Sequence, residues 1–147
     1  MDGNMMIRRD FLAISSAFAA VSPLRGRAET GRDALTFKPG VLAEHLRKGA
    51  TVFLTFKASW CATCAAQTRV LEKLKAENAA DVRLVTFIDA DWDTYGRAQF
   101  ATRMRIPRHG TLVVLKGDEE LGRIVADTGE EKIRGLLSIA TAAARAG

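Results

Sequence analysis

The stretch that decides the fold reads Thr51-Val-Phe-Leu-Thr-Phe-Lys-Ala-Ser-Trp-Cys-Ala-Thr-Cys64. Its first six residues are β-branched, aromatic or leucine, which is typical of a buried strand. A helical pattern follows over residues 61–78 and places Val70, Leu71, Leu74 and Ala76 nearest the core. Since a buried strand leads directly into an amphipathic helix, the segment indicates an α/β architecture.

The same alternation continues on both sides of this stretch. Strands are predicted over residues 34–37, 82–88, 111–116 and 121–126, and helices over residues 39–48, 95–104 and 130–145. The last two strands are separated only by residues 117–120, which is short enough for an antiparallel hairpin. Parallel strands need crossover helices, so we expect a central mixed β-sheet flanked by helices, ending in a hairpin and a helix. On the helix over 61–78 we expect outward side chains at Arg69, Glu72, Lys73, Lys75 and Glu77.

Length and composition indicate a single folded domain. The chain has 147 residues, of which 48% are hydrophobic and 27% charged, with only 3 prolines. These figures do not fit intrinsic disorder, collagen-like repeats or a disulfide-dense miniature scaffold. The formal net charge is +5, and residues 29–147 carry 18 basic against 15 acidic side chains. An excess so small and scattered predicts no nucleic-acid partner.

The first 28 residues have the pattern of an export signal. Arg8-Arg9 precedes the apolar run Phe11 to Val21, and Gly26-Arg27-Ala28 offers small residues for a signal peptidase. The paired arginines resemble a Tat signal, although Ile7 stands where Ser or Thr is usual. We therefore expect residues 1–28 to be a Tat-like signal peptide and residues 29–147 to be the periplasmic domain. The expected export route is Tat rather than Sec. The apolar run would span only about 16 Å as a helix, which is too short for an uncleaved membrane anchor. We expect no stable membrane span in the mature chain.

The two cysteines, Cys61 and Cys64, stand three residues apart where the strand gives way to the helix. The first thiol would lie at a helix N-terminus, where free N–H groups and the helix dipole lower the pKa of a thiol. The second would lie one turn further on, within reach of a mixed disulfide formed by the first. This spacing predicts redox chemistry.

Metal binding and an inert disulfide are the alternatives. A c-type haem would require histidine at position 65, where the chain has Ala65. A structural zinc site would require two more ligands, and the chain offers only His45 and His109. A disulfide across two intervening residues closes too small a loop to add much stability through chain entropy.

The segment Phe56-Lys-Ala-Ser-Trp-Cys-Ala-Thr-Cys64 resembles the active-site segment of the thioredoxin superfamily, and residues 111–117 with the following strand resemble its C-terminal hairpin. The resemblance implies a thioredoxin fold, with Cys61 as nucleophile and Cys64 as resolving cysteine. It also implies thiol–disulfide exchange with protein thiols and disulfides, and no bound cofactor beyond the redox-active disulfide. The residues expected to support the cysteines are Trp60, Ala62, Thr63 and Lys57.

Two positions depart from the family pattern. Many thioredoxins have a buried aspartate where this chain has Thr55, so the proton of the resolving thiol must pass to water, to Lys57 or to the cluster of residues 89–93. The family also has a cis-proline before the hairpin, a slot that alignment gives to Gly110 unless a rebuilt loop brings in Pro107. His109, Gly110 and Thr111 are then expected to form the substrate-contacting loop.

The sequence thus predicts periplasmic disulfide exchange. Ala62-Thr63 lacks the histidine often found in strongly oxidising members, which favours disulfide reduction. A reductant outside the cytoplasm needs recharging, so we expect a membrane-bound electron donor, or an acceptor if the flow is reversed. One alternative is a periplasmic Cu(I) metallochaperone that uses both thiolates with the aid of His109. Another is a redox-inactive scaffold.

Overall fold

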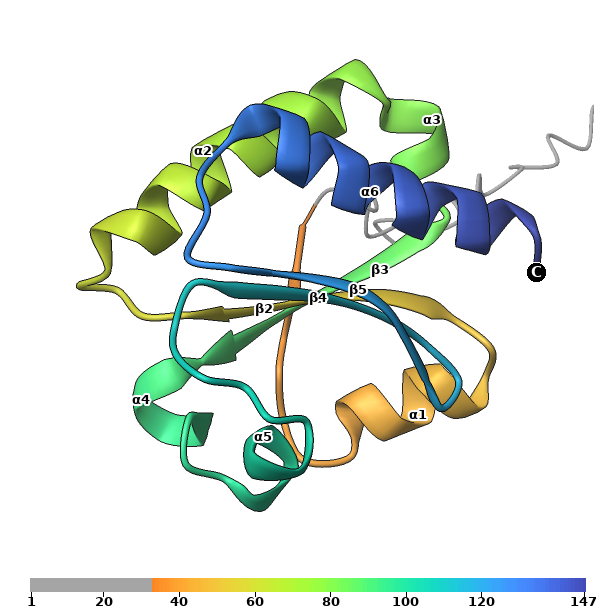
Figure 1. Cartoon of the computed structure of the whole chain (residues 1–147). Helices are drawn as coiled ribbons and strands as arrows, with labels where there is room; N and C mark the ends of the chain where they lie inside the picture. Colours follow the sequence, from red (N-terminus) through yellow and green to blue (C-terminus); the bar gives the residue numbers. More distant parts are fainter. Residues whose placement is uncertain (1–32) are drawn as a thin grey trace, which may run out of the picture.

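The computed structural model describes residues 33–147, so the predicted signal segment, residues 1–28, lies outside the described part. The described chain forms one five-stranded sheet with helices on both faces (Figure 1). The strands are β1 (Leu35–Thr36), β2 (Thr51–Lys57), β3 (Val85–Asp91), β4 (Thr111–Lys116) and β5 (Glu119–Val125). The helices are α1 (Val41–Arg47), α2 (Ala62–Glu77), α3 (Ala79–Val82), α4 (Trp92–Tyr95), α5 (Gln99–Arg103) and α6 (Glu130–Arg145).

The sheet is mixed, as the short and long connections predict. Its order is β1-β3-β2-β4-β5, with β2 parallel to β3 and antiparallel to β4. The central strand is β2, because its first six residues are all buried and can be covered on both faces. The predicted hairpin is formed by β4 and β5, which pair antiparallel with a register irregularity after Val114.

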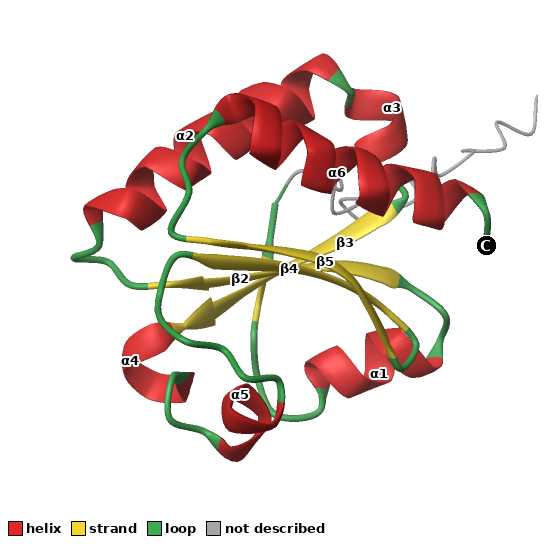
Figure 2. Cartoon of the chain, viewed as in Figure 1, coloured by secondary structure: helices red, strands yellow, loops and turns green. Residues whose placement is uncertain are grey.

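The helices form two layers, one on each face of the sheet. α2, α3 and α6 cover one face, and α1, α4 and α5 cover the other (Figure 2). Successive residues of β2 supply both layers, since side chains alternate across a strand: Phe53 packs against the α2 and α6 side, whereas Leu54 and Phe56 pack on the opposite side. The central strand therefore lies between two apolar cores and is held firmly where it leads into α2.

Two predicted elements had the wrong bounds. The strand predicted over residues 82–88 begins only at Val85 and continues to Asp91, because residues 79–82 form the helical turn α3 and bury Val82 among the helices. The helix predicted over residues 95–104 is two short helices, α4 and α5. In both places the apolar residues of two successive elements follow one another so closely in the sequence that they look like a single element. The shift places Asp89 inside β3, paired in register with Thr55 of β2.

The outward face predicted for α2 was wrong at Lys75, and the inward face was wrong at Ala76. Lys75 is only 3% exposed, and Ala76 is exposed. The ammonium of Lys75 lies 3.9 Å from the centre of the Phe87 ring and 3.1 Å from Glu72 Oε1. A lysine can occupy such a position because its long apolar stem packs in the core while the charged end meets a ring face and a carboxylate.

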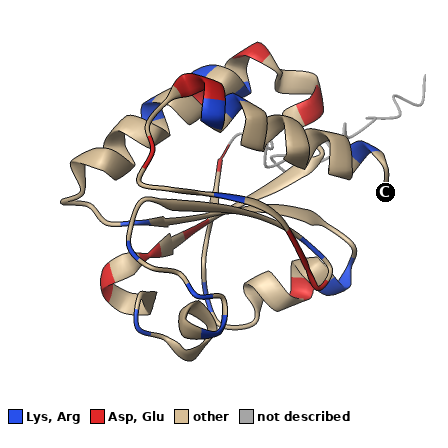
Figure 3. Cartoon of the chain, in the orientation of Figure 1, with Lys and Arg blue, Asp and Glu red and all other residues tan. Residues whose placement is uncertain are grey.

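Charged residues occur on both helical layers (Figure 3). Several of them form ion pairs that join one helix to another. Lys73 of α2 binds Glu130 of α6 at 3.0 Å, and Arg134 of α6 binds Glu77 of α2 at 2.9 Å. The pairing agrees with the small net charge seen in the sequence. Among residues 33–147, no helix has the length and apolar character needed to span a bilayer.

Candidate active site

The two cysteines lie where β2 turns into α2. Cys61 is the N-cap residue of α2, with an extended backbone, and its Sγ accepts a hydrogen bond from the Cys64 backbone N–H at 3.1 Å. The sulfur thus satisfies an N–H group that has no partner within the helix, as capping side chains do. The two residues form a disulfide. A thiolate at Cys61 after reduction would keep the same donor and the positive end of the helix dipole.

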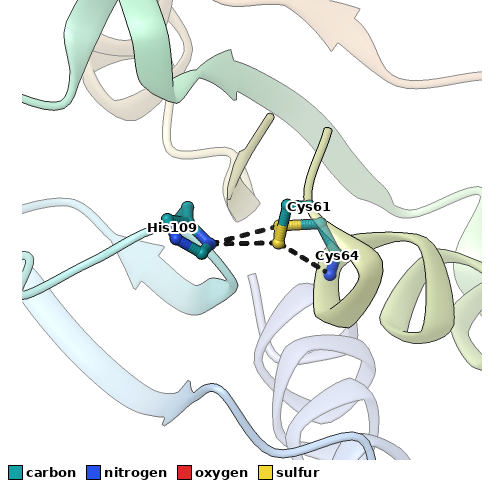
Figure 4. Close-up of side chains that lie close together, drawn as sticks. All are labelled: Cys61, Cys64 and His109. Carbon is teal, nitrogen blue, oxygen red and sulfur yellow. Dashed lines mark hydrogen bonds between the residues drawn. A yellow bond between two sulfur atoms is a disulfide. The ribbon is translucent and has the colours of Figure 1, made fainter. Parts of the chain in front are cut away.

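His109 approaches the pair from the loop before β4. Its Nδ1 atom lies 3.0 Å from Cys61 Sγ and 4.0 Å from Cys64 Sγ (Figure 4). The imidazole meets two indole rings edge to face, with ring centres 4.7 Å away at Trp60 and 6.1 Å away at Trp92. Trp60 is 60% exposed, yet it is held in place because its Nε1–H donates to both carboxylate oxygens of Asp93 at 3.0 and 3.1 Å. The histidine ring is therefore fixed against the first sulfur.

Gly110, and not Pro107, faces the turn between the cysteines. Gly110 is buried with φ +73°, and a Cβ added there would lie 3.4 Å from Cγ2 of Thr63. Pro107 is exposed. All peptide bonds in the described residues are trans. The backbone N–H of Gly110 donates to the Phe56 carbonyl at 2.8 Å, so a proline, which has no N–H and a negative φ, does not fit this loop.

The loop that carries His109 is tied down at several points. The Gly110 carbonyl accepts hydrogen bonds from the Ala126 N–H at 2.9 Å and from Nε2 of Gln67 at 2.9 Å. The same Gln67 nitrogen donates to the Asp127 carbonyl at 3.0 Å. Thr111 is buried, and its hydroxyl donates to the Arg108 carbonyl at 2.7 Å, which makes it part of the loop's internal structure.

Lys57 and Asp89 form an ion pair behind the cysteines. Lys57 Nζ lies 2.5 Å from Asp89 Oδ2, and both side chains are partly exposed. Both residues line a hollow of about 620 Å³ together with Cys61 and Cys64. They also line a cavity of about 30 Å³ that Thr55 borders on the inside, which is room enough for a water molecule. The carboxylate of Asp89 thus lies one strand away from Thr55, its partner in the sheet register.

The hollow has a mixed lining of cysteines, small residues, hydroxyls and charged side chains. Besides the cysteines and the ion pair, hydroxyls and charged side chains line it, namely Thr36, Ser59, Thr68, Arg69 and Asp91. Cys61 is only 5% exposed and Cys64 only 3%, so an incoming sulfur must enter this hollow or the side near His109 to reach them. Ala62 is exposed beside the pair and Thr63 is half-buried, which leaves Ala62 at the outer surface of the turn.

The structure thus brings together the expected site residues, namely Lys57, Trp60, Cys61, Ala62, Thr63, Cys64, His109 and Gly110. Pro107 is exposed, His45 lies on α1, and the side chain of Thr111 is used within its own loop. It also reveals Gln67 as a contact that sequence reasoning missed, and it shows how two members of the 89–93 cluster reach the site: Trp92 lies against His109 and Asp93 accepts from Trp60. Asp93 and Trp92 belong to the polar cluster noted at the end of the third strand, but nothing in that cluster indicates a partner 33 positions away. Gln67 lies on α2 and is only 1% exposed. Because it is polar, the spacing of apolar residues does not identify it as buried.

Comparisons with known proteins support the resemblance. No protein-family model matches the chain. Thioredoxin H2-1 of Oryza sativa subsp. japonica is 32% identical over 87 residues, which cover 59% of this chain and 59% of that protein. The chain thus matches about three fifths of the length of this curated relative.

Solved structures show the same fold. The crystal structure of Trxlp from Edwardsiella tarda EIB202 has a TM-score of 0.63 at 22% identity, covering 71% of this chain and 98% of that one. A thioredoxin from Trypanosoma brucei brucei has a TM-score of 0.62 at 18% identity, covering 76% of this chain and 93% of that one. The thioredoxin fold expected from the sequence is confirmed, with a Cys61–Cys64 pair at the junction of β2 and α2.

Proposed function

We propose that the protein exchanges thiols and disulfides with protein partners, with Cys61 as nucleophile and Cys64 as resolving residue. The observation that carries the proposal is the Cys61–Cys64 disulfide at the start of α2, where the Cys64 N–H donates to the sulfur of Cys61. This arrangement stabilises a thiolate on the first cysteine and keeps the second sulfur within bonding reach. The 32% identical relative is a thioredoxin, which supports the same chemistry.

In the reducing direction the Cys61 thiolate attacks a client disulfide. A mixed disulfide forms, and the first client sulfur leaves as a thiolate that takes up a proton. Cys64 then loses its proton and attacks Cys61 Sγ, so the second client sulfur leaves and the Cys61–Cys64 disulfide forms. Two electrons have passed to the client, and a dithiol donor must return them before the next cycle.

The proton of Cys64 needs an acceptor, since Thr55 does not ionise at neutral pH. We assign this role to Asp89, reached through water in the hollow that Cys64 shares with the Lys57–Asp89 pair. Lys57 holds the carboxylate in place. Asp89→Asn should slow the second step, so that the mixed disulfide with a client accumulates. If it does not accumulate, bulk water takes the proton.

The direction of electron flow depends on two opposing features. The intervening Ala62-Thr63 dipeptide favours reduction of clients, as expected from the sequence. His109 stabilises the reduced form by contacting Cys61 from outside the motif, and this raises the reduction potential. We propose client reduction as the role, and the measured potential of the Cys61–Cys64 pair tests it. A value near that of strongly oxidising proteins would reverse the assignment.

The activity test is reduction of insulin disulfides with dithiothreitol as the electron source. Wild-type protein should accelerate insulin precipitation, and Cys61→Ser should abolish the acceleration. Cys64→Ser is the matched control, because it retains the nucleophile and should trap mixed disulfides. Equal rates for wild type and Cys61→Ser would refute the exchange function.

We further propose that the protein acts in the periplasm and is recharged by a membrane-bound partner. The export proposal rests on Arg8-Arg9 and the apolar run that follows. Mass spectrometry of a periplasmic fraction should find a chain that begins near Glu29, and an intact N-terminus would contradict cleavage. The Cys64→Ser trap, applied in intact cells, should capture a membrane protein among its disulfide-linked partners.

A further inference from the structure

Three soft or borderline ligand atoms converge at the disulfide. Cys61 Sγ, Cys64 Sγ and His109 Nδ1 all lie within 4.8 Å of one another, and residues 33–147 contain no other such group of His, Cys and carboxylate side chains. We propose that the reduced protein binds one Cu(I) ion between the two thiolates and the imidazole. This site goes beyond disulfide exchange and does not depend on it.

The donor set selects a soft, low-coordinate ion. Thiolate sulfur and imidazole nitrogen both suit Cu(I), whereas Mg²⁺ and Ca²⁺ need oxygen ligands. Zn²⁺ takes four ligands, so here its fourth position would fall to water, in a site where both sulfurs are almost fully buried. Cu(I) is satisfied by three ligands. Nδ1 of His109 lies 3.0 Å from Cys61 Sγ and 4.0 Å from Cys64 Sγ, so the nitrogen is beside both sulfurs.

The charges balance at this position. Two thiolates and one Cu(I) leave a net charge of −1, which lies at the N-terminus of α2. The Cys64 N–H donates to Cys61 Sγ there, and the helix dipole favours negative charge. Binding displaces the proton of the Cys64 thiol and any proton still held by Cys61, and leaves copper in the same oxidation state. In the metal-free reduced form Nδ1 of His109 donates to the Cys61 thiolate; when copper binds, the imidazole proton moves to Nε2 and the lone pair of Nδ1 faces the ion.

The third ligand is held in place before any metal arrives. The His109 ring lies against the indole of Trp60, and the Gly110 N–H bond to Phe56 fixes the backbone next to it. Both sulfurs are almost fully buried. A preformed and shielded site loses little freedom when the ion binds, so the histidine adds affinity beyond that of a flexible dithiol peptide.

Redox state controls the site. The disulfide occupies both sulfurs, so a dithiol reductant must first deliver two electrons to the Cys61–Cys64 bond. Copper binding and disulfide exchange then exclude each other, because each uses the Cys61 sulfur. Bound Cu(I) should therefore inhibit insulin reduction by the wild-type protein, and a chelator should restore it.

The test is a Cu(I) titration of the reduced protein without oxygen, in competition with a bicinchoninate chelator. Wild type should bind one Cu(I) per chain. His109→Phe should keep that stoichiometry and bind at least about tenfold more weakly. His45→Phe is the matched control, since His45 lies on α1 away from the cluster, and its affinity should equal that of wild type.

X-ray absorption at the copper edge supplies a second readout. We expect two sulfur and one nitrogen neighbours in wild type, and loss of the nitrogen in His109→Phe. His109→Asn provides the same comparison if the phenylalanine variant fails to fold, as judged by circular dichroism. Equal affinity with and without the histidine, or copper binding that survives Cys64→Ser, would overturn the site. The insulin assay is independent, so failure here leaves the exchange function standing.

Discussion

Replacing His109 with phenylalanine should make the protein a stronger reductant. Nδ1 of His109 lies 3.0 Å from Cys61 Sγ, where it can donate a hydrogen bond to the thiolate of the reduced form. A hydrogen bond to a charged group contributes about 1.5–3 kcal/mol. For a two-electron couple, about 1.4 kcal/mol corresponds to 30 mV, so the potential should fall by about 30–65 mV. The half-buried position of His109 favours the lower part of this range.

The phenylalanine ring fills the same space between Trp60 and Trp92, so packing changes little while the nitrogen is lost. The assay equilibrates each protein with redox buffers of graded potential and counts dithiol by alkylation and mass. His45→Phe, on α1, should leave the potential unchanged. A His109→Phe potential within about 10 mV of wild type, or above it, would refute the view that the histidine stabilises the reduced cysteine.

Three further changes test the fold around the site. Gly110→Ala should cost about 1–3 kcal/mol of unfolding free energy, because φ is +73° there; a denaturation midpoint equal to wild type would contradict the loop geometry. Phe53→Ala should cost about 3–5 kcal/mol, since this ring is fully buried between α2, α6 and the sheet, and Phe53→Leu should cost clearly less. Side-chain hydrogen bonds from Lys73 and Arg134 lower the pKa of Glu130 below its usual 4.5. Glu130 therefore adds stability that is fully present above pH 4.5 and is lost as the pH falls through its lowered pKa. The Glu130→Gln variant should therefore lose less stability than wild type over that pH range. Parallel plots of stability against pH for the two proteins would count against the ion pairs of Glu130.

The main elements of the fold could be predicted from the sequence because their signals are local. The β-branched run at residues 51–56 and the apolar spacing of the helix after it identify β2 and α2. The errors occur where local signals overlap. Val82 reads as strand because it is apolar and adjoins another apolar run, but it packs as a helical turn under α6.

The burial of apolar residues could be predicted from the sequence, but the burial of individual charged or polar residues could not. Lys75 reads as a surface residue, and only the position of the Phe87 ring beside Glu72 allows it inside. Gln67 can be buried because its side-chain amide N–H donates hydrogen bonds to the Gly110 and Asp127 carbonyls. Such partners come from distant segments, so no helical periodicity can indicate them.

The sequence by itself determined the cysteine pair. The two sulfurs lie one helical turn apart where a strand ends, so they need no distant contact to come together. Only the folded arrangement decided what surrounds them. Strand register sets Asp89 opposite Thr55, and the path of the loop before β4 carries His109 across 48 positions to Cys61. The reason is physical, since helical spacing acts over a few residues, whereas contacts between strands and loops depend on how whole layers pack.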